Sequence, residues 1–418
     1  MEPYKPIDCS LHDHYEAAAV RRQRMSLTAR YPDSLGERTG IITDIVVSDG
    51  AEYLVLDNGP GDPTRPHRIL RREPVMTERI LIASYVEPDL VERVRRTVPE
   101  IDVIYRPDLL RPPRYPADHK GADRDRTPEQ EAEWRGLLGE ATILYDFDRT
   151  HLDDLPDLAP NVHWVQATSA GIGQLVGRQA YADRMPDTVF TTARGVHAIP
   201  LAEFAAMSML MHSRRAGHFQ ALQSNKEWER YAATDLAGRT AVVVGLGAVG
   251  SEVARVAQAL RLRVVGVRRN TTGADTLPID ELVGPSHLMT HLPDADFLIL
   301  VAPHTPETEG MIGAKQLAAL PRGAALINIG RGALVDEPAL IASLESGHVA
   351  AAYLDVFAEE PLPMNSPLWE MPNVLITPHS ASTSDRENGR IIDIFCENLR
   401  RYLAGEPRLN VLDTVLLY

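Results

Sequence analysis

Short apolar runs alternate with helical patterns along the second half of the chain. The runs cover 240–244, 263–267, 297–301, 324–329, 349–354 and 374–376. Runs of this length, apolar except for Thr240, Arg263 and Asn328, are typical of parallel strands buried on both faces. In the segment 251–260 apolar residues recur every three or four positions, and 313–320 and 337–346 are also helical in pattern. The alternation predicts a parallel sheet with right-handed crossovers and helices on both faces.

The same alternation begins near residue 79. Strands are predicted at 79–84, 101–105, 141–145 and 162–165, and helices at 89–97 and 129–138. Five prolines and many charges in 107–128 predict an exposed connection. A helix over 200–214, with Pro200 in its first turn, leads into the second group of strands. The last predicted helix, 384–404, is expected to return to the first group, which makes that domain discontinuous.

Residues 1–75 show less pattern. An Ala- and Arg-rich stretch predicts a helix over 11–30. Two apolar runs around Ser48-Asp49-Gly50 predict a β-hairpin over 40–57. No catalytic pattern is present in this extension, which is interpreted as either a lid or subunit contact or a structural appendage.

Composition narrows the class of protein. Among 418 residues, 58 are acidic and 43 basic, a formal charge of −15, which argues against nucleic acid and anionic membranes as partners. No apolar run reaches the roughly 18 residues of a membrane span, and the first residues lack a signal-peptide core. Cys9 and Cys396 form no metal or disulfide pattern. We therefore expect a cytoplasmic protein without a bound metal.

A glycine motif follows the strand at 240–244. It reads Gly245-x-Gly247-x-x-Gly250 and leads directly into a predicted helix. The first glycine permits a sharp turn, the second lets a pyrophosphate approach, and the third lets the helix pack closely on the strand. The helix N-terminus offers free N–H groups to phosphates. A strand before and a helix after make this motif a predicted dinucleotide site.

Charged residues follow the later predicted strands. Arg331 follows one strand, Asp355 and Glu360 the next, and His379 the last. Each has an ordinary alternative: a surface charge for Arg331, a helix cap for Asp355, a solvated loop residue for Glu360 and a core histidine for His379. Because carboxyl ends of parallel strands share one edge of a sheet, we expect all four beside the nucleotide loop.

These motifs identify a family. The chain resembles the D-isomer-specific 2-hydroxyacid dehydrogenases from about residue 79 onward, most strongly over 236–380, in the motifs LAGRT…GLGAVG, APHTPET, NIGRGALVD, LDVFAEEPLP and TPHS. The resemblance implies an α/β fold with two Rossmann-like parallel-sheet domains after an N-terminal extension (1–75). These are a flavodoxin-like substrate domain (76–195 and 381–418) and an NAD(P)-binding Rossmann domain (196–380).

The resemblance also implies roles for single residues. Arg331, Glu360 and His379 would be catalytic, with Arg331 and His379 touching both substrate and cofactor. Asp355 would hold the nicotinamide carboxamide. The amides of Ala170 and Gly171, in a small-residue turn at a strand end, would bind the substrate carboxylate. Further implied cofactor contacts are Ala248, Val249, Ala302, Pro303, Thr308 and Ile329.

The residue types suit reduction of a 2-oxo acid. An imidazole, whose ordinary pKa is about 6.5, can hydrogen-bond the carbonyl oxygen and deliver a proton, which suits His379. A carboxylate at Glu360 would favour and orient the imidazolium. The planar fork of Arg331 can fix the 2-oxo acid. An ionised Asp355 only accepts hydrogen bonds, as a carboxamide requires.

One position departs from the family pattern. NAD-specific members carry an acidic residue after the second strand, but here Arg268 occupies that place and Arg269 follows. Two guanidinium groups suit a 2′-phosphate better than a 2′-hydroxyl, although both side chains could instead face solvent. We therefore expect NADP in preference to NAD.

The function predicted from the sequence is reduction of a small 2-oxo acid to its D-2-hydroxy acid, or the reverse, of the glyoxylate or hydroxypyruvate reductase type. A homodimer is expected. Two alternatives stay open: an enzyme like phosphoglycerate dehydrogenase, and a dinucleotide-sensing interaction protein of the corepressor kind. The sequence does not identify the substrate side chain or the physiological direction.

Overall fold

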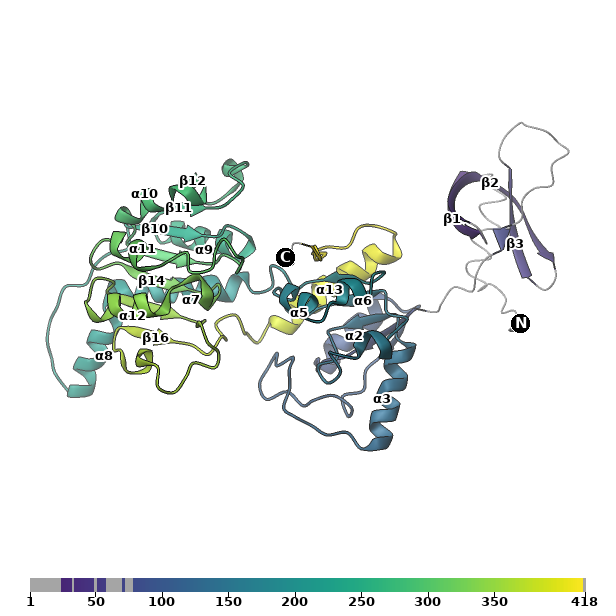
Figure 1. Cartoon of the computed structure of the whole chain (residues 1–418), viewed down its shortest axis with the longest axis horizontal. Helices are drawn as coiled ribbons and strands as arrows, with labels where there is room; N and C mark the ends of the chain where they lie inside the picture. Colours follow the sequence, from purple (N-terminus) through teal and green to yellow (C-terminus); the bar gives the residue numbers. More distant parts are fainter. Residues whose placement is uncertain (1–23, 32–33, 49–50, 58–69, 72–77, 416–418) are drawn as a thin grey trace. The chain divides into compact units, whose positions relative to one another are not determined.

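A computed structural model describes residues 24–31, 34–48, 51–57, 70–71 and 78–415. The chain forms two compact units, Met1–Thr77 and Glu78–Tyr418. The second unit contains two parallel sheets, one of seven strands and one of five (Figure 1). No helix within these ranges is both long and apolar enough to cross a membrane.

The first unit contains an antiparallel sheet in the order β1-β2-β3-β4. The predicted hairpin is confirmed: β2 pairs with β3, from Ser48 opposite Ala51 to Ile41 opposite Asp57. The predicted helix over 11–30 is wrong for residues 24–30, which pair with β2, so pairing with the next strand overrides local helix propensity there. Residues 11–23 and the turn residues Asp49 and Gly50 lie outside the described residues. The strands are β1 (Arg24–Tyr31), β2 (Ser34–Ser48), β3 (Ala51–Asp57) and β4 (Leu70–Arg71).

The seven-stranded sheet is wholly parallel, in the order β12-β11-β10-β13-β14-β15-β16. Six of its strands fall on the predicted apolar runs; β12 is three residues long and gives no readable pattern. Its strands are β10 (Thr240–Val244), β11 (Arg263–Val267), β12 (Glu281–Val283), β13 (Phe297–Leu300), β14 (Ala325–Asn328), β15 (Ala351–Leu354) and β16 (Val374–Ile376).

Helices cover both faces of this sheet, as predicted. Alternate strand residues point to opposite faces, so Val243 joins a core with helices α7 and α9, whereas Val242 joins a core with α10, α11 and α12. Helix α8 continues from α7 after a left-handed residue, Arg215. The helices are α7 (Ala198–Arg214), α8 (Ala216–Asn225), α9 (Ala248–Ala259), α10 (Leu288–His291), α11 (Ala314–Ala319) and α12 (Glu337–Glu345). Short 3₁₀ turns are Ala274–Thr276, Pro285–His287, Leu292–Asp294, Gly332–Leu334 and Pro367–Glu370.

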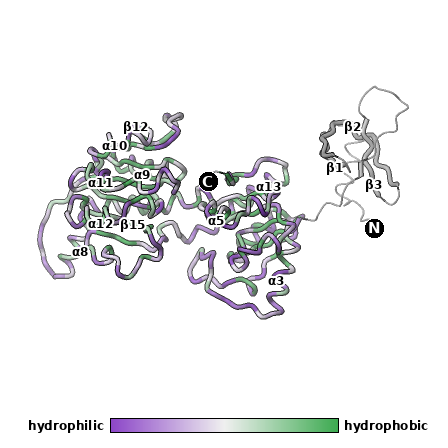
Figure 2. Tube along the Cα trace, viewed as in Figure 1, coloured by the Kyte–Doolittle hydropathy of each residue, from purple (hydrophilic) through white to green (hydrophobic). Residues whose placement is uncertain are grey.

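The five-stranded sheet is also parallel, in the order β6-β5-β7-β8-β9. The last helix, α13, packs against α2 and buries Ile391 and Phe395 with Ile80 of β5, so the end of the chain completes this layer. Figure 2 shows hydrophobic stretches running through both sheets. Its elements are β5 (Arg79–Ile82), α2 (Pro88–Thr97), β6 (Asp102–Ile104), α3 (Pro128–Glu140), β7 (Ile143–Tyr145), α4 (Leu155–Leu158), β8 (Trp164–Gln166), α5 (Gly173–Arg178), α6 (Tyr181–Arg184), β9 (Val189–Thr191) and α13 (Glu387–Leu403).

The connection between β6 and α3 is more buried than its composition predicts. Leu109 and Leu110 are 1% and 2% exposed and belong to the core under α3. Asp118 is also buried, and its carboxylate accepts hydrogen bonds from the backbone N–H groups of Arg114 and Gly121. The segment is otherwise largely exposed, as predicted, and Leu109, Leu110 and Asp118 hold it on the domain.

Candidate active site

The glycine motif joins β10 to α9 and leaves room where a phosphate would pass. Gly245 has a φ of +101°, and a Cβ placed on it would lie 2.7 Å from the backbone nitrogen of Ala302. A Cβ on Gly250 would lie 1.8 Å from the carbonyl oxygen of Gly245. A Cβ on Gly247 would meet nothing within 4 Å among the described residues. Gly245 and Gly250 are therefore required because the backbone packs closely around them, whereas Gly247 keeps the space before α9 open.

This motif lies where the order of strands reverses. β11 and β12 extend the sheet on one side of β10, and β13 begins the other side. Open α/β sheets bind ligands at the carboxyl edge at such a point. After β13, Thr308 donates a hydrogen bond from Oγ1 to the carbonyl oxygen of Pro303, at 2.8 Å, and accepts one from the backbone N–H of Thr305. The predicted contact residues after β13 thus form a closed, hydrogen-bonded loop beside the glycines.

Arg331 follows β14 in a tightly held turn. The side chain of Asn328 donates from Nδ2 to the Arg331 carbonyl oxygen, at 3.0 Å, and accepts from the Gly330 N–H, at 3.1 Å. A Cβ on Gly332 would lie 1.9 Å from the carbonyl carbon of Phe357, so only glycine fits there. The turn therefore packs directly against the segment that follows β15.

Asp355 follows β15 and is 2% exposed. Its Oδ1 accepts three hydrogen bonds, from Thr377 Oγ1 and from the backbone N–H groups of Ser380 and Ala381, at 2.8, 2.9 and 2.9 Å. Burial raises the pKa of Asp355, and these hydrogen bonds oppose that rise. Its Oδ2 makes no hydrogen bond to the described residues, so one oxygen stays available as an acceptor.

His379 follows β16 and pairs with Glu360. Its Nδ1 lies 2.8 Å from Glu360 Oε2, and the side chains are 46% and 36% exposed. The other carboxylate oxygen of Glu360 accepts the backbone N–H of Phe357, at 3.1 Å. His379 has a φ of +50° and donates its N–H to the Asp355 carbonyl oxygen. A non-glycine residue in this left-handed region costs roughly 1–2 kcal/mol, and the surrounding hydrogen bonds hold it there.

The turn after β8 lies beside Arg331. A Cβ on Gly171 would lie 2.5 Å from Nη2 of Arg331. The Gly171 N–H donates to the hydroxyl of Ser169, at 3.2 Å. Ala170 and Gly171 are both exposed. The structure thus brings together the turn and the guanidinium that the sequence assigned to the same substrate.

The arginines after β11 are held by the protein itself. The guanidinium of Arg268 donates to the carbonyl oxygens of Asn270 and Thr272. Hydrogen bonds from Thr305 and from the Glu307 backbone lower the pKa of Glu307, and the charge of Arg269 lowers it further by a smaller amount. Arg268 is half-buried and bonded to its own loop, whereas the side chain of Arg269 is exposed, as the alternative considered from the sequence expects.

Comparison with known proteins places these features in a family. The family model described as "D-isomer specific 2-hydroxyacid dehydrogenase, NAD binding domain" matches residues 206–381. A D-isomer specific 2-hydroxyacid dehydrogenase from Xanthobacter autotrophicus Py2, solved with NADPH and MES, is 31% identical with a TM-score of 0.66, covering 82% of this chain and 100% of that one. The chain belongs to the D-isomer specific 2-hydroxyacid dehydrogenase family. Its members are NAD(P)-dependent oxidoreductases.

Two further relatives belong to this dehydrogenase family. A glyoxylate reductase from Korarchaeum cryptofilum is 33% identical over 236 residues, which span 53% of this chain and 68% of the relative. An NADPH-dependent glyoxylate/hydroxypyruvate reductase from Sinorhizobium meliloti, solved with NADP and sulfate, is 26% identical with a TM-score of 0.64, covering 82% of this chain and 100% of that one.

The residues present fit a nicotinamide dinucleotide. Gly247 leaves open space before α9, and the free Oδ2 of Asp355 can accept a carboxamide N–H. Three residues that position the site escaped the sequence reasoning, namely Asn328, Thr377 and Ser169. Each is a small polar residue at or within four residues of a predicted strand end, and such placement is the signal that could have found them.

Proposed function

We propose that this dehydrogenase reduces a small 2-oxo acid to the D-2-hydroxy acid, or catalyses the reverse, with NADPH preferred. The observation that carries the proposal is the 2.8 Å pair of His379 and Glu360 on the same sheet edge as Arg331 and Asp355. An acid–base group, an arginine fork and a buried acceptor are the groups that reduction of a 2-oxo acid requires.

A bound nicotinamide would supply the hydride. We assign His379 to donating a hydrogen bond to the carbonyl oxygen and then a proton, as negative charge grows there. Glu360 accepts from Nδ1 and so directs the other ring nitrogen, Nε2, to the substrate. Arg331 and the amides of Ala170 and Gly171 bind the substrate carboxylate and polarise the carbonyl.

The cofactor contacts follow the glycine motif. The N–H groups of Ala248 and Val249 open α9 and face phosphate, while Ala302, Pro303, Thr308 and Ile329 line the same edge. Asp355 accepts the carboxamide through Oδ2. The two solved relatives named above contain NADPH and NADP, which supports, by similarity, the same cofactor here.

NADPH preference rests on Arg268 and Arg269. The end of β11 lies beside the adenosine ribose in this fold. On binding a 2′-phosphate, Arg268 would exchange its two carbonyl partners for a charge-assisted pair. Such a pair is worth roughly 1.5–3 kcal/mol, or one to two powers of ten in affinity.

Steady-state kinetics with NADPH and NADH test this preference. The expected kcat/KM favours NADPH by at least about tenfold, and added salt narrows the gap. Arg268→Asp should invert the order, because the carboxylate accepts from a 2′-hydroxyl and repels a phosphate. Arg269→Ala should weaken the preference without inverting it. Equal efficiency with both cofactors, or an Arg268→Asp enzyme that still prefers NADPH, would contradict the proposal.

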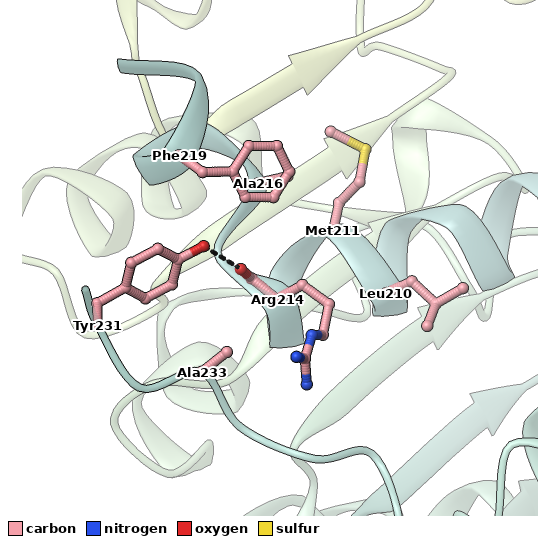
Figure 3. A pocket seen from close by; sticks show the side chains of 7 residues that line it. All are labelled: Leu210, Met211, Arg214, Ala216, Phe219, Tyr231 and Ala233. Carbon is pink, nitrogen blue, oxygen red and sulfur yellow. Dashed lines mark hydrogen bonds between the residues drawn. The ribbon is translucent and has the colours of Figure 1, made fainter. Parts of the chain in front are cut away.

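A homodimer is the second part of the proposal. A pocket of about 590 Å³ lies between α7, α8 and the following loop. Figure 3 shows its lining residues, among them Leu210, Phe219 and Tyr231. Trp228, in that loop, is 98% exposed, and Leu210 and Phe219 are 42% and 43% exposed. Exposed apolar side chains beside an apolar pocket suit burial against a second copy. Light scattering should show a dimer that Phe219→Asp converts to monomers; a monomeric wild type would contradict this.

The remaining assignments stay proposals. We propose the domain boundaries 1–75, 76–195 with 381–418, and 196–380, and a cytoplasmic location. Turnover with 2-oxo acids separates the enzyme from a dinucleotide-sensing interaction protein. A strong preference for a phosphorylated 2-oxo acid would favour the phosphoglycerate dehydrogenase alternative.

A further inference from the structure

The chain passes between its two parallel sheets twice. The first crossing, residues 192–197, leads from β9 of the five-stranded sheet to α7, and the second crossing, 377–386, leads from β16 of the seven-stranded sheet to α13. His197 ends the first crossing, and Glu387 begins α13 directly after the second. Nε2 of His197 lies 3.2 Å from Oε1 of Glu387. One side-chain pair thus joins both crossings at the points where their helices begin.

This pair lies in a largely buried part of the five-stranded domain. The side chains of His197 and Glu387 are 16% and 7% exposed. The neighbouring Asn388 is 3% exposed and donates from Nδ2 to Oε2 of Glu87, at 2.8 Å, at the residue before α2. The start of α13 is therefore fixed to its own domain. A hydrogen bond to a carboxylate in such surroundings is stronger than one in water.

The first crossing is bonded to the turn that we propose binds the substrate carboxylate. The Ala193 N–H donates to the carbonyl oxygen of Ser169, at 3.2 Å. Ser169 directly precedes Ala170 and Gly171, and His197 follows Ala193 within the same short crossing. The position of His197 therefore constrains the position of that turn.

The second crossing begins beside the proposed acid, His379. The N–H groups of Ser380 and Ala381 both donate to Oδ1 of Asp355, at 2.9 Å, so this end belongs to the seven-stranded domain. The other end reaches Glu387, the first residue of α13, which packs in the five-stranded domain. The second crossing is therefore attached to one domain at its start and to the other at its end.

We propose that His197 and Glu387 are positioning residues for the reduction, because their pair sets the separation between the carboxylate turn and His379. The substrate has to reach both, with its carboxylate at the turn and its carbonyl oxygen at the imidazole. A pair that holds the two sides at this separation removes part of the ordering cost of substrate binding. The proposed cofactor contacts all lie in the seven-stranded domain, so NADPH binding should not depend on the pair. This inference rests on the proposed function.

His119 offers a matched control for His197. Its Nε2 lies 3.5 Å from the same Oε1 of Glu387, and its side chain is 12% exposed, close to the value for His197. His119 belongs to the connection between β6 and α3, inside the five-stranded domain. It can stabilise the carboxylate of Glu387, but it does not link the two crossings.

Kinetics with hydroxypyruvate and NADPH distinguish the two histidines. His197→Leu should raise KM for hydroxypyruvate about fivefold with kcat nearly unchanged, because it removes binding energy common to the ground and transition states. Its Kd for NADPH should stay unchanged. His119→Leu should alter none of these values, although both variants should lower the melting temperature, since each removes a partner of a buried carboxylate. An equal rise in KM for both variants, or none for His197→Leu, would overturn the proposal.

Further variants keep the test valid if His197→Leu misfolds. The His197 side chain does not cap α7, so His197→Gln leaves the helix start intact, retains an N–H donor and should keep KM near the wild-type value. Glu387→Gln should raise KM in the same direction as His197→Leu. The double variant should raise KM no further than His197→Leu alone, because two residues that act through one pair are not additive. Independent, multiplying effects, or an unchanged KM in Glu387→Gln, would contradict the pair.

Hydrogen–deuterium exchange of the full-length protein separates this inference from the proposed function. Backbone amides of residues 382–386 lie between the two attachments of the second crossing. They should exchange faster in His197→Leu than in the wild type or His119→Leu, whether or not the protein turns over. Unchanged exchange would overturn the inference. Absence of NADPH oxidation with every 2-oxo acid would contradict the proposed function, whereas faster exchange with an unchanged KM would contradict only the positioning role.

Discussion

Two buried aspartates occupy equivalent places in the two parallel sheets but differ in their partners. Asp355 follows β15 and Asp146 follows β7, with exposures of 2% and 0%. Oδ1 of Asp355 accepts three hydrogen bonds, whereas neither oxygen of Asp146 accepts one from the described residues. A buried carboxylate is stable when hydrogen bonds replace its hydration. Asp355 is thus held by three hydrogen bonds, whereas Asp146 faces the guanidinium of Arg149, whose Nη2 lies 3.6 Å from it.

The largest effect is expected at the seven-stranded edge, in His379→Gln. The amide cannot deliver a proton, so kcat should fall on the order of 10²–10⁴, while cofactor affinity changes little. Steady-state kinetics and a fluorescence titration with NADPH measure the two quantities. A variant that keeps more than half of the wild-type kcat would remove His379 from the proposed role.

Arg331→Lys tests whether the planar shape of the guanidinium or only its charge matters for activity, beside the turn of Ala170 and Gly171 that we propose binds the substrate carboxylate. A lysine cannot reproduce the planar fork, so kcat/KM should fall roughly 10²–10³-fold, nearly as far as in Arg331→Ala. Comparison of both variants with the same 2-oxo acid decides this. A lysine variant with near-normal kcat/KM would show that Arg331 supplies charge alone.

The glycine motif offers a matched pair of substitutions. A Cβ on Gly247 meets no described residue, so Gly247→Ala should fold normally but weaken cofactor binding by about tenfold, because the added methyl enters the pyrophosphate path. A Cβ on Gly250 lies 1.8 Å from the Gly245 oxygen, so Gly250→Ala should lower the melting temperature as well. Unchanged cofactor affinity in Gly247→Ala would place the phosphates elsewhere.

The smallest effect is expected in the five-stranded domain, at Glu387. Burial opposes its ionisation, but the ring of His119, 3.5 Å away, and a hydrogen bond from His197 outweigh burial and lower its pKa to about 2. The ordinary value is about 4.3, so ionised Glu387 stabilises the fold above that pH, and the contribution is lost as the pH falls toward 2.

Glu387→Gln should therefore lower the free energy of unfolding at pH 7, and the gap to the wild type should close as the pH falls below about 4. Urea unfolding across this range measures the gap, with Glu100→Gln, at an exposed position, as control. A gap that is constant with pH would mean that the ionised carboxylate does not stabilise the fold.

The sequence predicts those parts of the fold in which a short segment must have particular residue types. The apolar run at β11 has the bounds read from the sequence, Arg263–Val267, because a strand buried on both faces leaves no polar alternation. The glycines and the residues after β14, β15 and β16 were predictable because parallel strands bring their carboxyl ends to one edge.

Other parts depend on contacts outside the segment itself. Residues 24–30 form a strand because the next strand, β2, pairs with them, although their own stretch of sequence indicates a helix. Leu109 and Leu110 sit in a proline-rich segment without periodicity, so their burial under α3 was not readable. The hydrogen bond from Gly171 to Ser169 and those from Arg268 to its own loop depend on side-chain rotamers.

The most direct test of the account follows NADPH oxidation by the purified protein with glyoxylate and hydroxypyruvate, together with chiral analysis of the glycerate that hydroxypyruvate yields. The account predicts one molecule of 2-hydroxy acid for each NADPH consumed, D-configured where the product is chiral, and turnover that His379→Gln reduces at least a hundredfold. No oxidation with any 2-oxo acid, or an L-configured product, would contradict it.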